Sequence, residues 1–155
     1  MNFRELILDR EFEEARKMLN KITDFDEKII DYAFDDDNIV YYDFYKFVLD
    51  SNNSAKLNWG ISKLLSTAFC YLDNAYENAY EYLKKAIELD SNNYDYYAHQ
   101  ISFYSLPVDE PIINKNELIQ IFINIKRMKK EDKEIDVFIN SYLSKEEKED
   151  VYKNV

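Results

Sequence analysis

Two segments of the chain repeat one pattern, and this repeat most limits what the chain can fold into. Residues 72–83 and residues 8–19 both read Leu-Asp-x-x-aromatic-Glu-x-Ala-x-x-large-Leu. In this pattern one helix ends at the Leu-Asp pair, a short corner follows, and the aromatic residue and the alanine begin the packed face of the next helix. A shorter repeat, Leu-Asp-Ser-Asn-Asn at 49–53 and 89–93, marks the ends of two other helices. We therefore expect an all-α fold of stacked antiparallel helical hairpins, an architecture that usually binds other proteins.

The composition favours a helical domain that folds without a metal ion or a disulfide. A chain of 155 residues is long enough to bury about 68–70% of its unfolded surface. It has one glycine, Gly60, and two prolines, Pro107 and Pro111, so the glycines that tight hairpins and phosphate-binding loops require are missing. The single cysteine, Cys70, excludes an internal disulfide and fits a reducing compartment.

Apolar spacing and helix-breaking residues predict about nine helices. We expect them at residues 2–8, 11–21, 24–34, 39–50, 54–72, 75–89 and 93–105, with two more around 118–125 and 135–142. In the helix at 39–50, Tyr42 and Tyr45 are expected on a different face from the packed side chains. The two hairpin repeats have different spacings, so the solenoid is degenerate. We expect one helical-repeat domain over residues 1–143 and a charged tail over residues 144–155 that frays, unless Val151 and Tyr152 dock it.

The net charge of −11, from 31 acidic and 20 basic residues, works against direct binding of nucleic acid, because that affinity comes largely from Lys and Arg. The start of the chain lacks the apolar core of a signal peptide, and no stretch approaches the ~18 apolar residues of a membrane span. We expect a cytoplasmic protein that contacts no membrane. The one basic cluster, residues 126–130, lies where a helix should end and complements the helix dipole. The acidity indicates a basic partner, or serves solubility alone.

Residues that could carry chemistry are few. His99 is the only histidine, which removes paired-histidine metal sites and most catalytic schemes that use a histidine base. The acidic run at residues 35–38 lacks the central glycine and distal glutamate of a calcium-binding EF-hand loop. We therefore predict no enzyme activity, no cofactor and no metal site.

Tyrosines beside carboxylates are the candidate contacts to a partner. The chain has 14 tyrosines and 10 phenylalanines, and tyrosine offers a large contact area while adjacent carboxylates can pair with Lys or Arg of a basic protein. An AT-rich coding sequence, which enriches Tyr, Asn, Lys, Ile and Asp together, is the alternative explanation. The candidate partner-binding residues are Asp35, Asp36, Asp37, Tyr42, Tyr45, Tyr94, Asp95 and Tyr96.

Residues 79–93 resemble the second helix and exit turn of a tetratricopeptide repeat. The matching features are the small Ala79, the large apolar Leu83, Ala86, and the closing Leu-Asp-x-Asn-Asn. Ser91 stands where the repeat normally has proline. The resemblance implies the fold class, with no regular peptide-binding groove.

The order of motifs from the helix at 54–72 onward resembles small bacterial immunity proteins of polymorphic-toxin and contact-dependent growth inhibition systems. The matching segments are 69–72, 73–76, 85–90 and 103–107. This resemblance implies a protein, monomeric when free, that binds the C-terminal domain of a cognate toxin and neutralises it. A basic, nuclease-type toxin would suit the acidic charge. The alternative is a generic adaptor that binds a peptide or chaperone-type partner.

Overall fold

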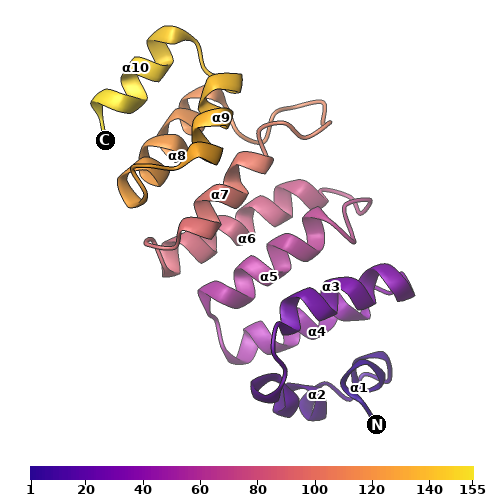
Figure 1. The fold of residues 1–155 in the computed structure, drawn as a ribbon. Helices are drawn as coiled ribbons and strands as arrows, with labels where there is room; N and C mark the ends of the chain where they lie inside the picture. The colour runs from indigo at the N-terminus through magenta and orange to yellow at the C-terminus, as the bar shows by residue number, and fades with distance from the viewer. The chain divides into compact units, whose positions relative to one another are not determined.

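The computed structural model describes residues 1–155 and contains ten α-helices, one short 3₁₀ helix and no strand. The chain divides into two compact units, Met1–Asp90 and Ser91–Val155. The first unit holds α1 (Phe3–Leu8), α2 (Phe12–Met18), the 3₁₀ helix η1 (Leu19–Lys21), α3 (Phe25–Asp36), α4 (Val40–Ser51), α5 (Ala55–Ser66) and α6 (Ala75–Leu89). The second holds α7 (Tyr94–Ser102), α8 (Lys115–Met128), α9 (Lys133–Tyr142) and α10 (Lys145–Lys153) (Figure 1). The all-α prediction is confirmed.

In the first unit, α5 and α6 form the most closely packed pair. Three alanines of α6 (Ala75, Ala79 and Ala86) are buried, and such small side chains let two helices approach. The buried Ile61 and Leu64 of α5 supply the large apolar side chains of this core.

Helix α5 ends earlier than the sequence predicts. The expected helix over residues 54–72 stops at Ser66, and Thr67 leaves the helical conformation with φ −123° and ψ −85°. The Ser66 and Thr67 hydroxyls donate to the carbonyl oxygen of Lys63 at 3.2 and 2.6 Å. These local bonds compete with the helical hydrogen bonds, which explains the early end.

Tyr45 is a second difference from the sequence prediction. It was expected to face away from the packed side of α4, yet it is 1% exposed and its hydroxyl donates to Oδ1 of Asp26 at 2.5 Å. Asp26 of α3 is itself buried. The buried carboxylate gives the tyrosine hydroxyl the partner that it needs inside the unit.

In the second unit, both prolines lie between α7 and α8 in a segment without helix, as predicted. Helix α8 begins at the cap Asn114, whose side chain accepts from the Glu117 amide, and it ends at Met128, within the basic cluster of residues 126–130. Its apolar side packs with α7, α9 and α10.

The segment after residue 143 is helical, where the sequence predicts a frayed tail. Ser144 and Glu147 form a capping box at the start of α10. Val151 is fully buried, and Tyr152 donates to Oδ1 of Asp136 at 2.9 Å. Capping and docking together stabilise a segment whose composition alone favours solvent.

Candidate protein-binding surface

The eight residues predicted to contact a partner fall in both units. Asp35, Asp36 and Asp37 lie at the turn between α3 and α4, and Tyr42 and Tyr45 lie in α4 of the same unit. Tyr94, Asp95 and Tyr96 begin α7 in the second unit. The structure gives these side chains very different surroundings.

Asp36 is held by the N-terminal helix. Arg4 of α1 donates from Nε to Oδ2 of Asp36 at 3.0 Å and from Nη2 to Oδ1 at 2.6 Å. The hydroxyl of Tyr41 donates to the same carboxylate. The hydrogen bonds from Arg4 are the largest cause and lower the pKa of Asp36; burial opposes them, and the Tyr41 hydroxyl adds a smaller lowering. Asp36 therefore joins α1 to the end of α3. Both oxygens of its carboxylate already accept hydrogen bonds within the chain, so they are poorly placed to bind a partner.

Asp35 and Asp37 remain open to solvent. The Asp35 side chain is 63% exposed, with Nη1 of Arg4 at 3.4 Å from Oδ2. Asp37 ends α3 in the left-handed conformation, with φ 44°. Its Oδ1 accepts a hydrogen bond from the Tyr71 hydroxyl at 2.8 Å, and this bond raises the pKa of Tyr71. Both carboxylates can therefore reach a partner.

Exposed apolar or aromatic side chains accompany these carboxylates, two from the end of α3 and the start of α4 and one from the segment after α5. Phe34 is 60% exposed, Ile39 is 39% exposed, and Tyr71, from the segment after α5, is 62% exposed. Phe34 lies in the last turn of α3, three residues before Asp37, and Tyr71 donates a hydrogen bond to Asp37. We name Phe34, Asp35, Asp37, Ile39 and Tyr71 the corner surface. Its two carboxylates are among the residues predicted from the sequence to contact a partner, and its three apolar or aromatic members are not.

The two tyrosines of α4 differ from each other. Tyr45 is buried on Asp26, and burial raises its pKa well above the ordinary value. The prediction that it contacts a partner is therefore wrong for the folded chain. Tyr42 is half-buried, and Nζ of Lys46 lies 4.4 Å from the centre of its ring. Burial, with a smaller contribution from the neighbouring Tyr42, raises the pKa of Tyr82.

Of the three candidates in α7, only Asp95 is exposed. The Tyr94 hydroxyl donates to Oδ2 of Asp132 at 2.5 Å, and Lys129 pairs with the same oxygen at 3.2 Å. The hydrogen bond from Tyr94 is the largest cause that lowers the pKa of Asp132 to about 2. Tyr94 therefore ties α7 to the segment between α8 and α9. Tyr96 is 4% exposed, so it too is removed from the candidate surface.

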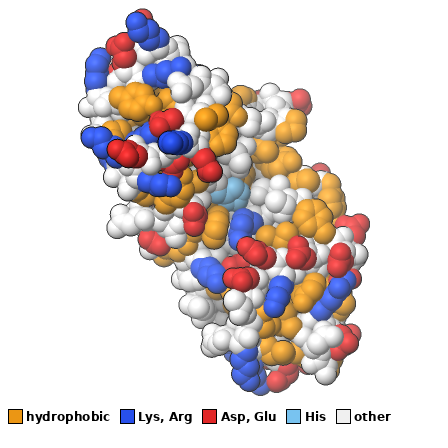
Figure 2. All heavy atoms as spheres, in the orientation of Figure 1, with side chains coloured by type: hydrophobic (Ala, Val, Ile, Leu, Met, Phe, Trp, Pro, Cys, Tyr) orange, Lys and Arg blue, Asp and Glu red, His pale blue; other side chains and the backbone are white.

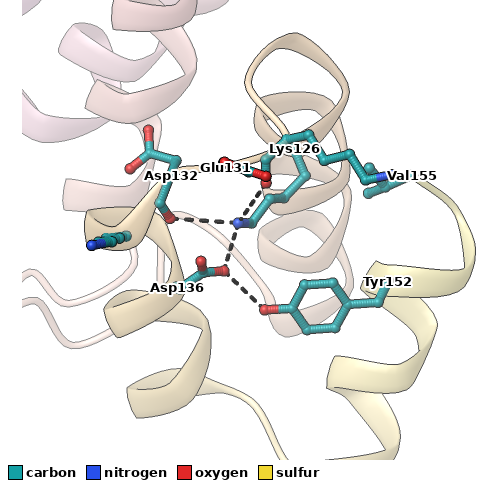
Figure 3. A pocket seen from close by; sticks show the side chains of 8 residues that line it. Lys126, Glu131, Asp132, Asp136, Tyr152 and Val155 are labelled. Atoms are coloured by element: carbon teal, nitrogen blue, oxygen red, sulfur yellow. Dashed lines mark hydrogen bonds and ion pairs between the residues drawn. The ribbon is translucent and has the colours of Figure 1, made fainter.

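A pocket of about 630 Å³ opens in the second unit beside the start of α9 and the end of α10. Figure 3 shows the Lys126 ammonium group at its centre. Although Lys126 is only 2% exposed, its Nζ reaches Oδ1 of Asp136 at 2.5 Å and the carbonyl oxygens of Lys130 and Asp132 at 3.1 and 3.4 Å. An ammonium group has three donors, and all three are used here. The pocket's polar groups thus bind one another and join α8 to α9.

Groups that could support catalysis are scattered. Cys70 and His99 belong to different units, and the His99 ring lies 5.4 Å from the ring of Phe103. No group of three or more His, Cys, Asp or Glu side chains could hold a metal ion. No helix has both the length and the apolar character needed to cross a membrane.

Comparison with known proteins gives no family for this chain, so its function has to be inferred from its own residues. No family model matches the chain, and no curated protein or solved structure is significantly similar to it.

Proposed function

We propose that this chain binds a basic protein in a stoichiometric complex and neutralises it, as an immunity protein neutralises the C-terminal domain of its bacterial toxin. The observation that carries the proposal is the corner surface, where three exposed apolar or aromatic side chains adjoin two solvent-facing carboxylates. Aromatic anchors surrounded by polar groups are typical of the residues that dominate binding energy at protein interfaces. A protein-binding role accounts for keeping such side chains in water.

Charge supports a basic partner. The first unit has 19 acidic and 11 basic side chains, a net charge of −8 out of −11 for the whole chain. On the face drawn in Figure 2, carboxylates lie among hydrophobic, Lys and Arg side chains over this unit, whose net charge is negative. Such a surface attracts a basic protein over a distance and can raise the association rate toward ~10⁸–10⁹ M⁻¹s⁻¹ at low salt. Most nuclease domains present basic surfaces to nucleic acid, for the reason that phosphate contacts dominate that affinity.

The experiment uses the C-terminal domain of the large protein encoded next to this chain as the candidate toxin. Co-expression measures rescue of growth, and calorimetry measures stoichiometry and affinity at two salt concentrations. We expect rescue with 1:1 binding that weakens as salt rises. Without rescue and binding, immunity is refuted and the adaptor function becomes the better account.

Matched variants locate the contact. Phe34→Ala removes an exposed ring from the corner surface, whereas Phe138→Ala removes a 41% exposed ring from α9 in the second unit. We expect Phe34→Ala to weaken binding at least tenfold, the scale of an interface residue worth about 1.4 kcal/mol. Phe138→Ala should bind as the unchanged chain does. Equal affinity for both variants would contradict the assignment of the corner surface.

A further inference from the structure

The turn between α3 and α4 already holds one arginine between a carboxylate and an aromatic ring. The guanidinium of Arg4 forks onto both oxygens of Asp36 and lies over the ring of Tyr32, with its central carbon 5.0 Å from the ring centre. A guanidinium is well suited to this arrangement because it is flat. It can donate two parallel hydrogen bonds to a carboxylate and also stack on an aromatic ring.

The neighbouring residue Asp37 has the same kind of surroundings without a cation. Its Oδ1 is held by the Tyr71 hydroxyl at 2.8 Å, and its carboxylate makes no ion pair within the chain. The ring of Tyr71 packs edge-on against the buried Phe69, with ring centres 6.2 Å apart and an angle of 84°. This contact fixes the ring while leaving it 62% exposed. Phe34 adds a second exposed ring one helical turn away.

We propose that Asp37, Tyr71 and Phe34 form the receiving site for an arginine side chain of the basic partner. The guanidinium pairs with the free oxygen of Asp37, and its flat face packs against the exposed ring of Tyr71 or Phe34. The identity of the partner rests on the proposed function, whereas the site itself can be tested without that partner.

Local charge favours an incoming cation at this position. Three consecutive carboxylates repel one another, and Arg4 pairs closely with Asp36 and more distantly with Asp35. Asp37 receives only the neutral Tyr71 hydroxyl. A second guanidinium would therefore relieve repulsion that the chain leaves uncompensated. Arginine suits the site better than lysine because a flat guanidinium can donate to the carboxylate while its face packs on an aromatic ring, whereas a compact ammonium group cannot stack in this way.

The test is an NMR titration of the full chain with N-acetyl-arginine methylamide. The citrulline analogue, which has similar size and no charge, and the lysine analogue serve as matched probes. We expect saturable shifts of the Phe34, Asp37 and Tyr71 resonances at concentrations on the order of tens of millimolar. The lysine analogue should bind more weakly and the citrulline analogue should leave these resonances unchanged. No saturable shift at the three residues, or equal shifts with citrulline, would overturn the proposal.

Asp37→Asn is the decisive variant because asparagine also tolerates the left-handed backbone that Asp37 adopts. We expect it to weaken arginine binding at least tenfold. The control Asp31→Asn removes an exposed carboxylate earlier in α3 and should have no effect. Unchanged arginine binding by Asp37→Asn would refute the site.

Failure of this inference and failure of the proposed function give different results. If arginine binds at Asp37 but the candidate toxin is not neutralised, the site exists and the immunity function is wrong. If the toxin is neutralised equally well by the unchanged chain and by Asp37→Asn, immunity stands and the arginine site is wrong.

Discussion

Gly60, the only glycine, lies where α3, α4 and α5 meet, and its replacement by alanine tests how the first unit is packed. A Cβ atom at this position would lie 2.7 Å from Oδ1 of Asp26, 2.7 Å from the Tyr45 hydroxyl and 2.8 Å from Cε1 of the same ring. The two oxygens are themselves joined by a buried hydrogen bond of 2.5 Å. Neither can move away from a new methyl group without weakening that bond.

The magnitude follows from three opposing contributions. Overpacking of a core costs about 1–3 kcal/mol, and weakening a buried hydrogen bond to a charged group costs about 1.5–3 kcal/mol. Alanine is favoured over glycine inside a helix by about 1 kcal/mol. We therefore expect Gly60→Ala to lower the free energy of unfolding by about 1.5–5 kcal/mol.

Urea denaturation followed by circular dichroism measures this change, provided that the slope of the transition is unchanged. Tyr45→Leu removes two of the three close atoms, so a double-mutant cycle isolates the clash. We expect Gly60→Ala to cost at least about 1 kcal/mol less in the Tyr45→Leu background. If Gly60→Ala alone stabilises the chain, as it would in an exposed helix, the packing argument is refuted.

Three further predictions concern the second unit. The folded pKa of Asp132, about 2, is below its unfolded value of about 3.9, so its stabilising contribution is full above about pH 5 and is lost as the pH falls toward 2. Tyr94→Phe removes the largest cause of this shift, so urea denaturation should show a larger destabilisation at pH 7 than at pH 2; equal values would refute the linkage. Ser144→Ala removes a cap and should cost about 1 kcal/mol, with faster amide hydrogen exchange confined to α10; unchanged exchange there would contradict the capping role. Lys126→Met removes the cation paired with Asp136, which keeps only the Tyr152 hydroxyl, and it removes the side-chain donor to the Lys130 carbonyl oxygen. It should lower the free energy of unfolding by about 2–3 kcal/mol in urea, whereas no loss would show that the lysine can be replaced.

Local signals in the sequence predicted the helices well. The loop with both prolines and the basic cluster at the end of α8 lie where they were expected. These features depend on neighbouring residues, because helix caps, prolines and dipole charges act within one or two turns. The early end of α5 also has a local cause, namely the Ser66 and Thr67 hydroxyls. The apolar spacing continues to Leu72 and therefore predicts a longer helix, although these two hydroxyl residues favour an end near Ser66.

Contacts between distant segments were beyond the reach of spacing arguments. Tyr45 is buried because Asp26, 19 residues earlier, accepts its hydrogen bond. Tyr71 joins the corner surface through Asp37, 34 residues earlier. A periodic pattern shows which side of a helix is apolar, but it does not show which distant polar group makes burial of a tyrosine favourable. The candidate surface was therefore only half predicted.

The three consecutive aspartates show why sequence position alone does not identify a binding residue. All three were equivalent candidates, yet Asp36 is taken by Arg4, which lies 32 residues away. Asp35 shares that arginine at a longer distance, and Asp37 meets only a tyrosine hydroxyl. All three contribute to the long-range attraction of a basic protein, because that field depends on total charge. Short-range pairing depends on which carboxylate still lacks a cation, and this condition selects Asp37. Under the proposed function, the residues that attract a partner and the residue that pairs with it would therefore be separable within one acidic run.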